Sequence, residues 1–152
     1  MKSTKRDWII MISIVVLAFL VYFGFEALFF NKKSNGAEVI YTPDGTLAYI
    51  DFEKETITKL KNQSNIPDSF NETFPIIKDN QITVLGDYTI NGVRQIVVIE
   101  VNFSKSSVKI VKEESPNNIC SKLGEQTNKP LICLPNNVRV SFTTDLDIDD
   151  EF

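Results

Sequence analysis

The stretch YTINGVRQIVVIEV, residues 88–101, decides the fold. Asn91 and Gly92 form the preferred two-residue turn of a β-hairpin, because both positions accept a positive φ. The residues on both sides of this turn are rich in β-branched types, which are typical of strands. The second arm, QIVVIEV at 95–101, is apolar at nearly every position, which favours a central strand covered on both faces. The stretch therefore predicts a hairpin within a β-sheet.

Strand and turn signals continue on both sides of this hairpin. Pro43-Asp44-Gly45 predicts a tight turn, 61–72 is a polar loop, and Gly86 marks a bulge or corner. Residues 120–126 allow one helical turn that ends at Gly124. Ten runs rich in β-branched and aromatic residues are candidate strands: 39–42, 46–52, 56–60, 73–77, 81–85, 87–90, 95–101, 106–113, 131–134 and 138–142. We therefore predict an all-β unit, a small barrel or sandwich of about seven to nine short strands.

The N-terminal part has a different character. WIIMISIVVLAFLVYFGF, residues 8–25, carries no charge and reaches the length of a membrane-spanning helix, and the apolar character continues to Phe30. A buried core helix is the alternative, but a small domain has no interior that covers such a segment on all sides. A cleaved signal peptide would have a shorter apolar region and a small-residue cleavage site. We therefore predict one uncleaved transmembrane anchor over 8–30.

Basic residues set the expected orientation of this anchor. Lys2, Lys5 and Arg6 precede it with the free amino terminus, whereas Lys32 and Lys33 follow it, so the positive-inside rule favours a cytoplasmic N-terminus. The chain then divides into a cytoplasmic tip (1–7), a single-pass cell-membrane anchor (8–30), a tether (31–38), an extracytoplasmic β domain (39–143) and an acidic tail (144–152).

The exported part is acidic. From Glu38 to Phe152 there are eighteen Asp and Glu residues against eleven Lys and Arg residues, a balance of −7. Such a surface is repelled by phosphate backbones, so nucleic acid is not an expected partner.

Cys120 and Cys133 are the only cysteines. Outside the cytoplasm two thiols favour one disulfide, and closing a loop of about fourteen residues stabilises a domain by about 3 kcal/mol. A reduced buried pair, a redox-active pair and a zinc site are the alternatives. The pair lacks the close Cys-x-x-Cys spacing of redox sites, and two sulfurs supply half of a tetrahedral zinc site in a chain without histidine.

Catalytic patterns are missing from the sequence. The chain has no histidine, which excludes Ser-His-Asp and Cys-His catalysis within one chain, and no Gly-rich phosphate loop. The aspartates of DLDIDD, residues 145–150, lack the Gly and the final Glu of a helix-loop-helix calcium site and are typical of a solvated tail. We predict a protein without enzymatic activity, metal or cofactor.

The C-terminal third resembles the NusG domain II family. SPNNIC, KLG and LICLPNNVRV match its pattern at Pro116, Asn117, Cys120, Gly124, Cys133, Leu134, Pro135, Asn136 and Val138. The resemblance implies a compact β-barrel-like or sandwich domain, which in many members from Gram-positive bacteria follows one N-terminal anchor and lies outside the cytoplasm. No activity is firmly attached to these members. The chain departs from the family at the insert 61–72 and at EQTNKP, residues 125–130.

These observations predict a membrane-tethered, non-catalytic binding or accessory module that contacts a protein partner at the cell surface. The loops 120–133 and 61–72 are the expected contact surfaces, because loops on a rigid scaffold usually carry recognition. A thiol-disulfide or electron-transfer accessory that uses Cys120 and Cys133 is the alternative, and easy reversible reduction of the bridge would favour it.

Overall fold

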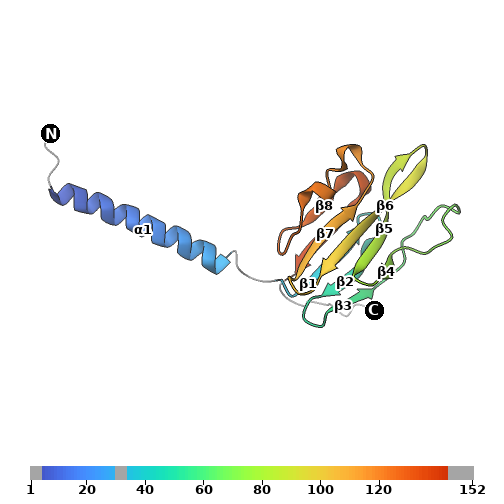
Figure 1. Cartoon of the computed structure of the whole chain (residues 1–152), viewed down its shortest axis with the longest axis horizontal. Coiled ribbons are helices and arrows are strands. Elements are labelled where there is room, and N and C mark those ends of the chain that lie inside the picture. Colours follow the sequence, from blue (N-terminus) through green and yellow to red (C-terminus); the bar gives the residue numbers. More distant parts are fainter. Residues whose placement is uncertain (1–4, 30–33, 144–152) are drawn as a thin grey trace. The chain divides into compact units, whose positions relative to one another are not determined.

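The computed structural model describes residues 5–29 and 34–143. The chain divides into two compact units, Met1–Lys32 and Lys33–Phe152. Helix α1 (Lys5–Phe29) belongs to the first unit, and all the strands belong to the second (Figure 1). The predicted acidic tail, 144–152, lies outside the described residues.

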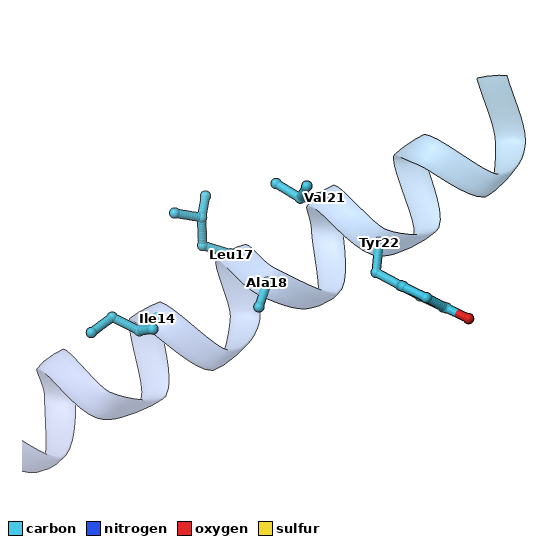
Figure 2. Close-up of a pocket in the computed structure, with 5 residues that line it drawn as sticks. All are labelled: Ile14, Leu17, Ala18, Val21 and Tyr22. Atoms are coloured by element: carbon cyan, nitrogen blue, oxygen red, sulfur yellow. The ribbon is translucent and has the colours of Figure 1, made fainter. Parts of the chain in front are cut away.

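Between Trp8 and Phe23, helix α1 presents large apolar side chains in all directions. Its large apolar side chains between Trp8 and Phe23 are 51% to 67% exposed. Figure 2 shows five of the side chains of α1 standing out from the helix: Ile14, Leu17, Ala18, Val21 and Tyr22. Among the residues that the structure describes, no helix is both long and apolar enough to cross a membrane. The end of the predicted anchor, 25–30, lies beyond the described side chains.

Nine strands within 34–143 form two antiparallel sheets, which confirms the predicted all-β unit. The first sheet has the order β3-β2-β1-β9-β8 and the second has the order β4-β5-β6-β7 (Figure 1). The strands are β1 (Gly36–Tyr41), β2 (Gly45–Asp51), β3 (Thr56–Lys59), β4 (Ile76–Lys78), β5 (Gln81–Ile90), β6 (Val93–Asn102), β7 (Ser107–Lys112), β8 (Leu131–Cys133) and β9 (Val138–Thr143). Strand β1 begins inside the segment 31–38 that we expected to be a tether.

The predicted hairpin joins β5 to β6. Ile90 pairs with Val93, and the turn residues Asn91 and Gly92 have φ values of 51° and 79°, as the Asn-Gly signal requires. The predicted strands 81–85 and 87–90 are one bulged strand, because the register of β5 shifts after Leu85. The register shift between Leu85 and Thr89 confirms the expected irregularity at Gly86.

One hydrophobic core lies between the two sheets and receives side chains from both. In β6, Val97, Ile99 and Val101 are buried, whereas Ile96 and Val98 are only half-buried. The prediction that β6 is covered on both faces is therefore wrong, because each sheet of a sandwich turns only one face to the core. In β7, Val108 and Ile110 are buried two positions apart, and in β9 the same holds for Val138 and Val140.

Candidate functional site: the Cys120–Cys133 loop

The segment 113–137, here called the disulfide loop, connects β7 to β9 and contains only short elements. These are the 3-10 turns η1 (Pro116–Asn118), η2 (Ser121–Leu123) and η3 (Leu134–Asn136), together with the edge strand β8. The predicted helical turn is η2, which ends at Gly124 with a φ of 73°. Strand β8 ends at Cys133, one residue before the predicted end, because Leu134 begins η3.

The two cysteines form the predicted disulfide. Their sulfur atoms are 2.05 Å apart and their Cα atoms are 5.3 Å apart. Cys120 is 2% exposed and Cys133 is 0% exposed. Thiol-disulfide exchange requires a thiolate to reach one sulfur atom. The burial of both cysteines therefore favours a structural bridge.

Asn136 fastens the end of the disulfide loop to β5. It is fully buried, its Nδ2 donates to the Sγ of Cys133 at 3.3 Å, and its Oδ1 accepts from the backbone N–H of Tyr88 at 3.3 Å. A Cβ on Gly86 would lie 2.1 Å from that Oδ1. The residue facing Asn136 must therefore be glycine, since no side-chain carbon fits in this space.

Glu113 brings a carboxylate into the buried surroundings of the disulfide. Glu113 is 3% exposed, and its Oε1 accepts from the backbone N–H of Cys120 at 3.1 Å. Its Oε2 has no hydrogen-bond partner among the described residues. One carboxylate oxygen and the two sulfur atoms all lie within 4.8 Å of one another. Sequence reasoning missed this residue, because no pattern distinguishes Glu113 from its neighbour Glu114.

The other side of the disulfide loop is held against β7. The carboxylate of Glu125 accepts from the hydroxyl of Ser107 at 2.6 Å and from Lys105 Nζ at 3.0 Å. The hydroxyl of Ser107 and then the Lys105 ammonium lower the pKa of Glu125. Gln126 and Val108 exchange two backbone hydrogen bonds of 2.9 Å. The loop is thus fixed at the disulfide, at Asn136 and along β7.

The residues that carry the family resemblance divide into two groups. Cys120, Cys133 and Asn136 come together in the buried part of the loop, and Val138 is also buried. The others lie on the surface: Pro116, Asn117, Gly124, Leu134 and Pro135. The structure therefore assembles only part of the motif around the bridge.

Large apolar side chains are exposed on this loop. Leu134 is 77% exposed, Ile119 56%, Ile132 47% and Leu123 44%. Where such side chains lie side by side, they form the kind of surface that binds another protein.

The insert 61–72, the second expected contact surface, is polar and mostly exposed. Gln63 is its buried anchor. Its Nε2 donates to the carbonyl of Leu85 at 2.6 Å, and its Oε1 accepts from the N–H of Leu85 at 2.9 Å. This insert exposes fewer large apolar side chains than the disulfide loop does.

A second polar cluster, which the sequence did not reveal, links the two sheets. The Arg94 guanidinium donates to Asp87 at 2.9 Å and to the hydroxyl of Tyr41 at 2.8 Å, and its Cζ lies 5.5 Å from the centre of the Tyr41 ring. Tyr41 also donates to Asp87, which accepts from Asn137 at 2.6 Å. Burial and then the hydrogen bond to Asp87 raise the pKa of Tyr41 to about 12. The cluster joins β1 to β5 and β6, which is a structural role.

No family model, curated protein or solved structure matches this chain. The resemblance to the NusG domain II family therefore stays a prediction.

Proposed function

We propose that this chain is a membrane-tethered, extracytoplasmic β domain that binds a protein partner through its disulfide loop and performs no catalysis. The observation that carries the proposal is the exposure of Ile119, Leu123, Ile132 and Leu134 on a loop that several buried contacts hold in place. A loop that is already ordered loses little conformational entropy when it binds, so its apolar area contributes more fully to affinity.

The charge of the exported part indicates the kind of partner. Its balance of −7 would repel acidic surfaces and steer a partner that presents basic residues around an apolar contact. Lys105 and Lys109 are already paired with Glu125 and Glu100, at 3.0 Å and 2.7 Å. The partner that fits best is therefore a protein with an apolar patch and a basic rim.

The N-terminal helix supports the proposal that the chain is tethered to a membrane. A helix that is apolar on all sides needs an apolar environment, and a bilayer supplies one. The structure describes side chains of α1 only up to Gly24. The apolar segment of the sequence is longer than this described part, because its uncharged stretch runs to Phe25 and its apolar character to Phe30. A tether of this kind raises the effective concentration of the domain toward partners at the same membrane.

Our proposal for the fold is based on the resemblance of the C-terminal third to the NusG domain II family. We propose that the two-sheet unit is a NusG domain II-like sandwich, as found outside the cytoplasm in Gram-positive bacteria. Two antiparallel sheets with one shared core, and a buried Cys120–Cys133 bridge, support this assignment.

Site-specific crosslinking tests the binding surface. A photoreactive phenylalanine analogue is placed at the position of Leu134, next to the edge strand β8. In a matched control it is placed at Leu60, which is 54% exposed and directly follows β3, the strand at the opposite edge of the first sheet. We expect a discrete crosslinked product in intact cells from position 134 only, and its loss when Ile132→Asp is added. Equal crosslinking from both positions would remove the support for this surface.

Protease treatment of intact cells tests the topology. We expect the β domain to be released while the N-terminal segment stays with the membrane fraction after an alkaline wash. A domain that is cut only after the cells are broken would contradict the extracytoplasmic location. If a mild dithiol reduced the bridge of the folded domain quickly and reversibly, the result would favour a thiol-disulfide accessory instead.

A further inference from the structure

We propose that reduction of the Cys120–Cys133 disulfide creates a buried binding site for a thiophilic divalent cation, such as Zn²⁺, with Glu113 as the third ligand. The three ligands are buried residues of the same disulfide loop whose exposed side chains form the protein-binding surface proposed above. It depends on three side chains that the fold gathers from the end of β7, from the start of η2 and from β8.

The positions of the three ligand atoms carry the proposal. One carboxylate oxygen of Glu113 and the two sulfur atoms lie within 4.8 Å of one another, and all three residues are at most 3% exposed. The Oε2 atom has no hydrogen-bond partner among the described residues, so it can bind a cation without losing an existing bond. The hydrogen bond from the N–H of Cys120 to Oε1 keeps the carboxylate oriented.

Zn²⁺ suits this combination of ligands. It binds thiolate sulfur at about 2.3 Å and carboxylate oxygen at about 2.0–2.2 Å in a tetrahedral arrangement. Two sulfur ligands at that distance are about 3.8 Å apart. Cα atoms 5.3 Å apart allow this separation through side-chain rotation, without a large backbone movement. Water takes the fourth position.

Charge gives the reason for binding. Two thiolates and a carboxylate in an interior without a cation would be strongly unfavourable, because buried charges need compensation. A divalent cation neutralises most of this charge. In the oxidised state the sulfur atoms are bonded to each other and are not thiolates, so the site exists only after reduction.

The chemical step balances. A dithiol donates two electrons and two protons to the disulfide and becomes a disulfide itself, which leaves two thiols on the protein. When the cation binds, both thiols release their protons to the solvent and two metal–sulfur bonds form. In the laboratory a water-soluble phosphine replaces the dithiol, and it takes up one oxygen atom from water as it is oxidised.

Cobalt spectroscopy tests the site. The full chain in detergent micelles is reduced with the phosphine without oxygen and is titrated with Co²⁺, which reports thiolate ligation by a near-ultraviolet charge-transfer band. We expect one equivalent to bind to the reduced protein with the visible bands of four-coordinate cobalt, and no such bands with the oxidised protein. Zn²⁺ should displace the Co²⁺.

Two matched variants isolate the role of the carboxylate. Glu113→Gln should weaken cobalt binding by at least about 100-fold, because even the loss of an outer-shell partner costs about 10–100-fold. Glu114→Gln makes the same chemical change one position away and should leave the affinity unchanged. Equal affinity in both variants would overturn the assignment of Glu113.

The state of the reduced protein also decides the outcome. Circular dichroism measures whether the reduced β domain is folded, with and without Co²⁺. A folded domain that binds the cation, or an unfolded one that Co²⁺ refolds with the same spectrum, supports the site. Reduced protein that fails to bind one equivalent overturns the proposal, whether it is folded or unfolded.

Discussion

Replacing Gly86 with alanine should place a methyl group against the side chain of Asn136. The added Cβ would lie 2.1 Å from Oδ1, 2.6 Å from Cγ and 2.8 Å from Cβ of Asn136. Asn136 is fully buried, so its side chain has no open space to enter. Gly86 itself does not have a left-handed φ, so the effect comes from crowding and not from backbone strain.

The contact between the added methyl group and Asn136 can be relieved in two ways, and each way lowers the free energy of unfolding. If β5 and η3 move apart, overpacking costs about 1–3 kcal/mol. If the side chain of Asn136 turns away, the N–H of Tyr88 loses its acceptor, and a buried group without a partner costs about 1–3 kcal/mol. We expect Gly86→Ala to lower the free energy of unfolding by about 2.5 kcal/mol. With about 2.1 cal/mol/K of unfolding entropy per residue over the described β unit, this lowers the Tm by about 11 °C.

A double-mutant cycle measures this contact directly. Thermal unfolding of the full chain in detergent, followed by circular dichroism, is compared for the wild type, Gly86→Ala, Asn136→Gly and the double variant. The Asn136→Gly background removes the three atoms nearest to the added methyl group, so Gly86→Ala should there be neutral or stabilise by about 0.4–1 kcal/mol through the unfolded state. A cost that is the same in both backgrounds, or a cost below about 0.5 kcal/mol in the wild type, would refute the reasoning.

The remaining predictions concern the disulfide and the polar cluster. Cys120→Ala together with Cys133→Ala should lower the free energy of unfolding by about 3 kcal/mol, because a loop of about fourteen residues is no longer closed in the unfolded chain. This loss should lower the Tm by about 13 °C. A Tm close to that of the wild type would contradict the structural role of the disulfide. The pKa of Tyr41 is about 12 in the folded state against an ordinary 10.0, so its contribution to stability is complete below pH 10 and is lost as the pH rises toward 12. Urea unfolding from about pH 9 to about pH 12 should therefore show a steeper loss for the wild type than for Tyr41→Phe, and parallel curves would disprove the shift.

The sequence by itself determined the local features of this protein. Preferences for a positive φ place the Asn91-Gly92 turn and end η2 at Gly124, and side-chain periodicity buries Val108 and Ile110 on the same face of β7. A few neighbouring residues decide each of these features. The cysteine pair was also predictable, because the chain contains only two cysteines and no other pairing exists.

Only the tertiary structure decided which distant residues meet. Glu113 reaches the disulfide, Gly86 faces Asn136, and Arg94 meets Tyr41 across 53 positions of sequence. These contacts depend on the order of the strands within the sheets and on the way one sheet lies on the other, so no short segment encodes them. The same reason explains why we wrongly predicted that β6 is covered on both faces. The apolar residues at 95–101 indicate only how hydrophobic the strand is, whereas the packing of the two sheets decides which of its faces is covered.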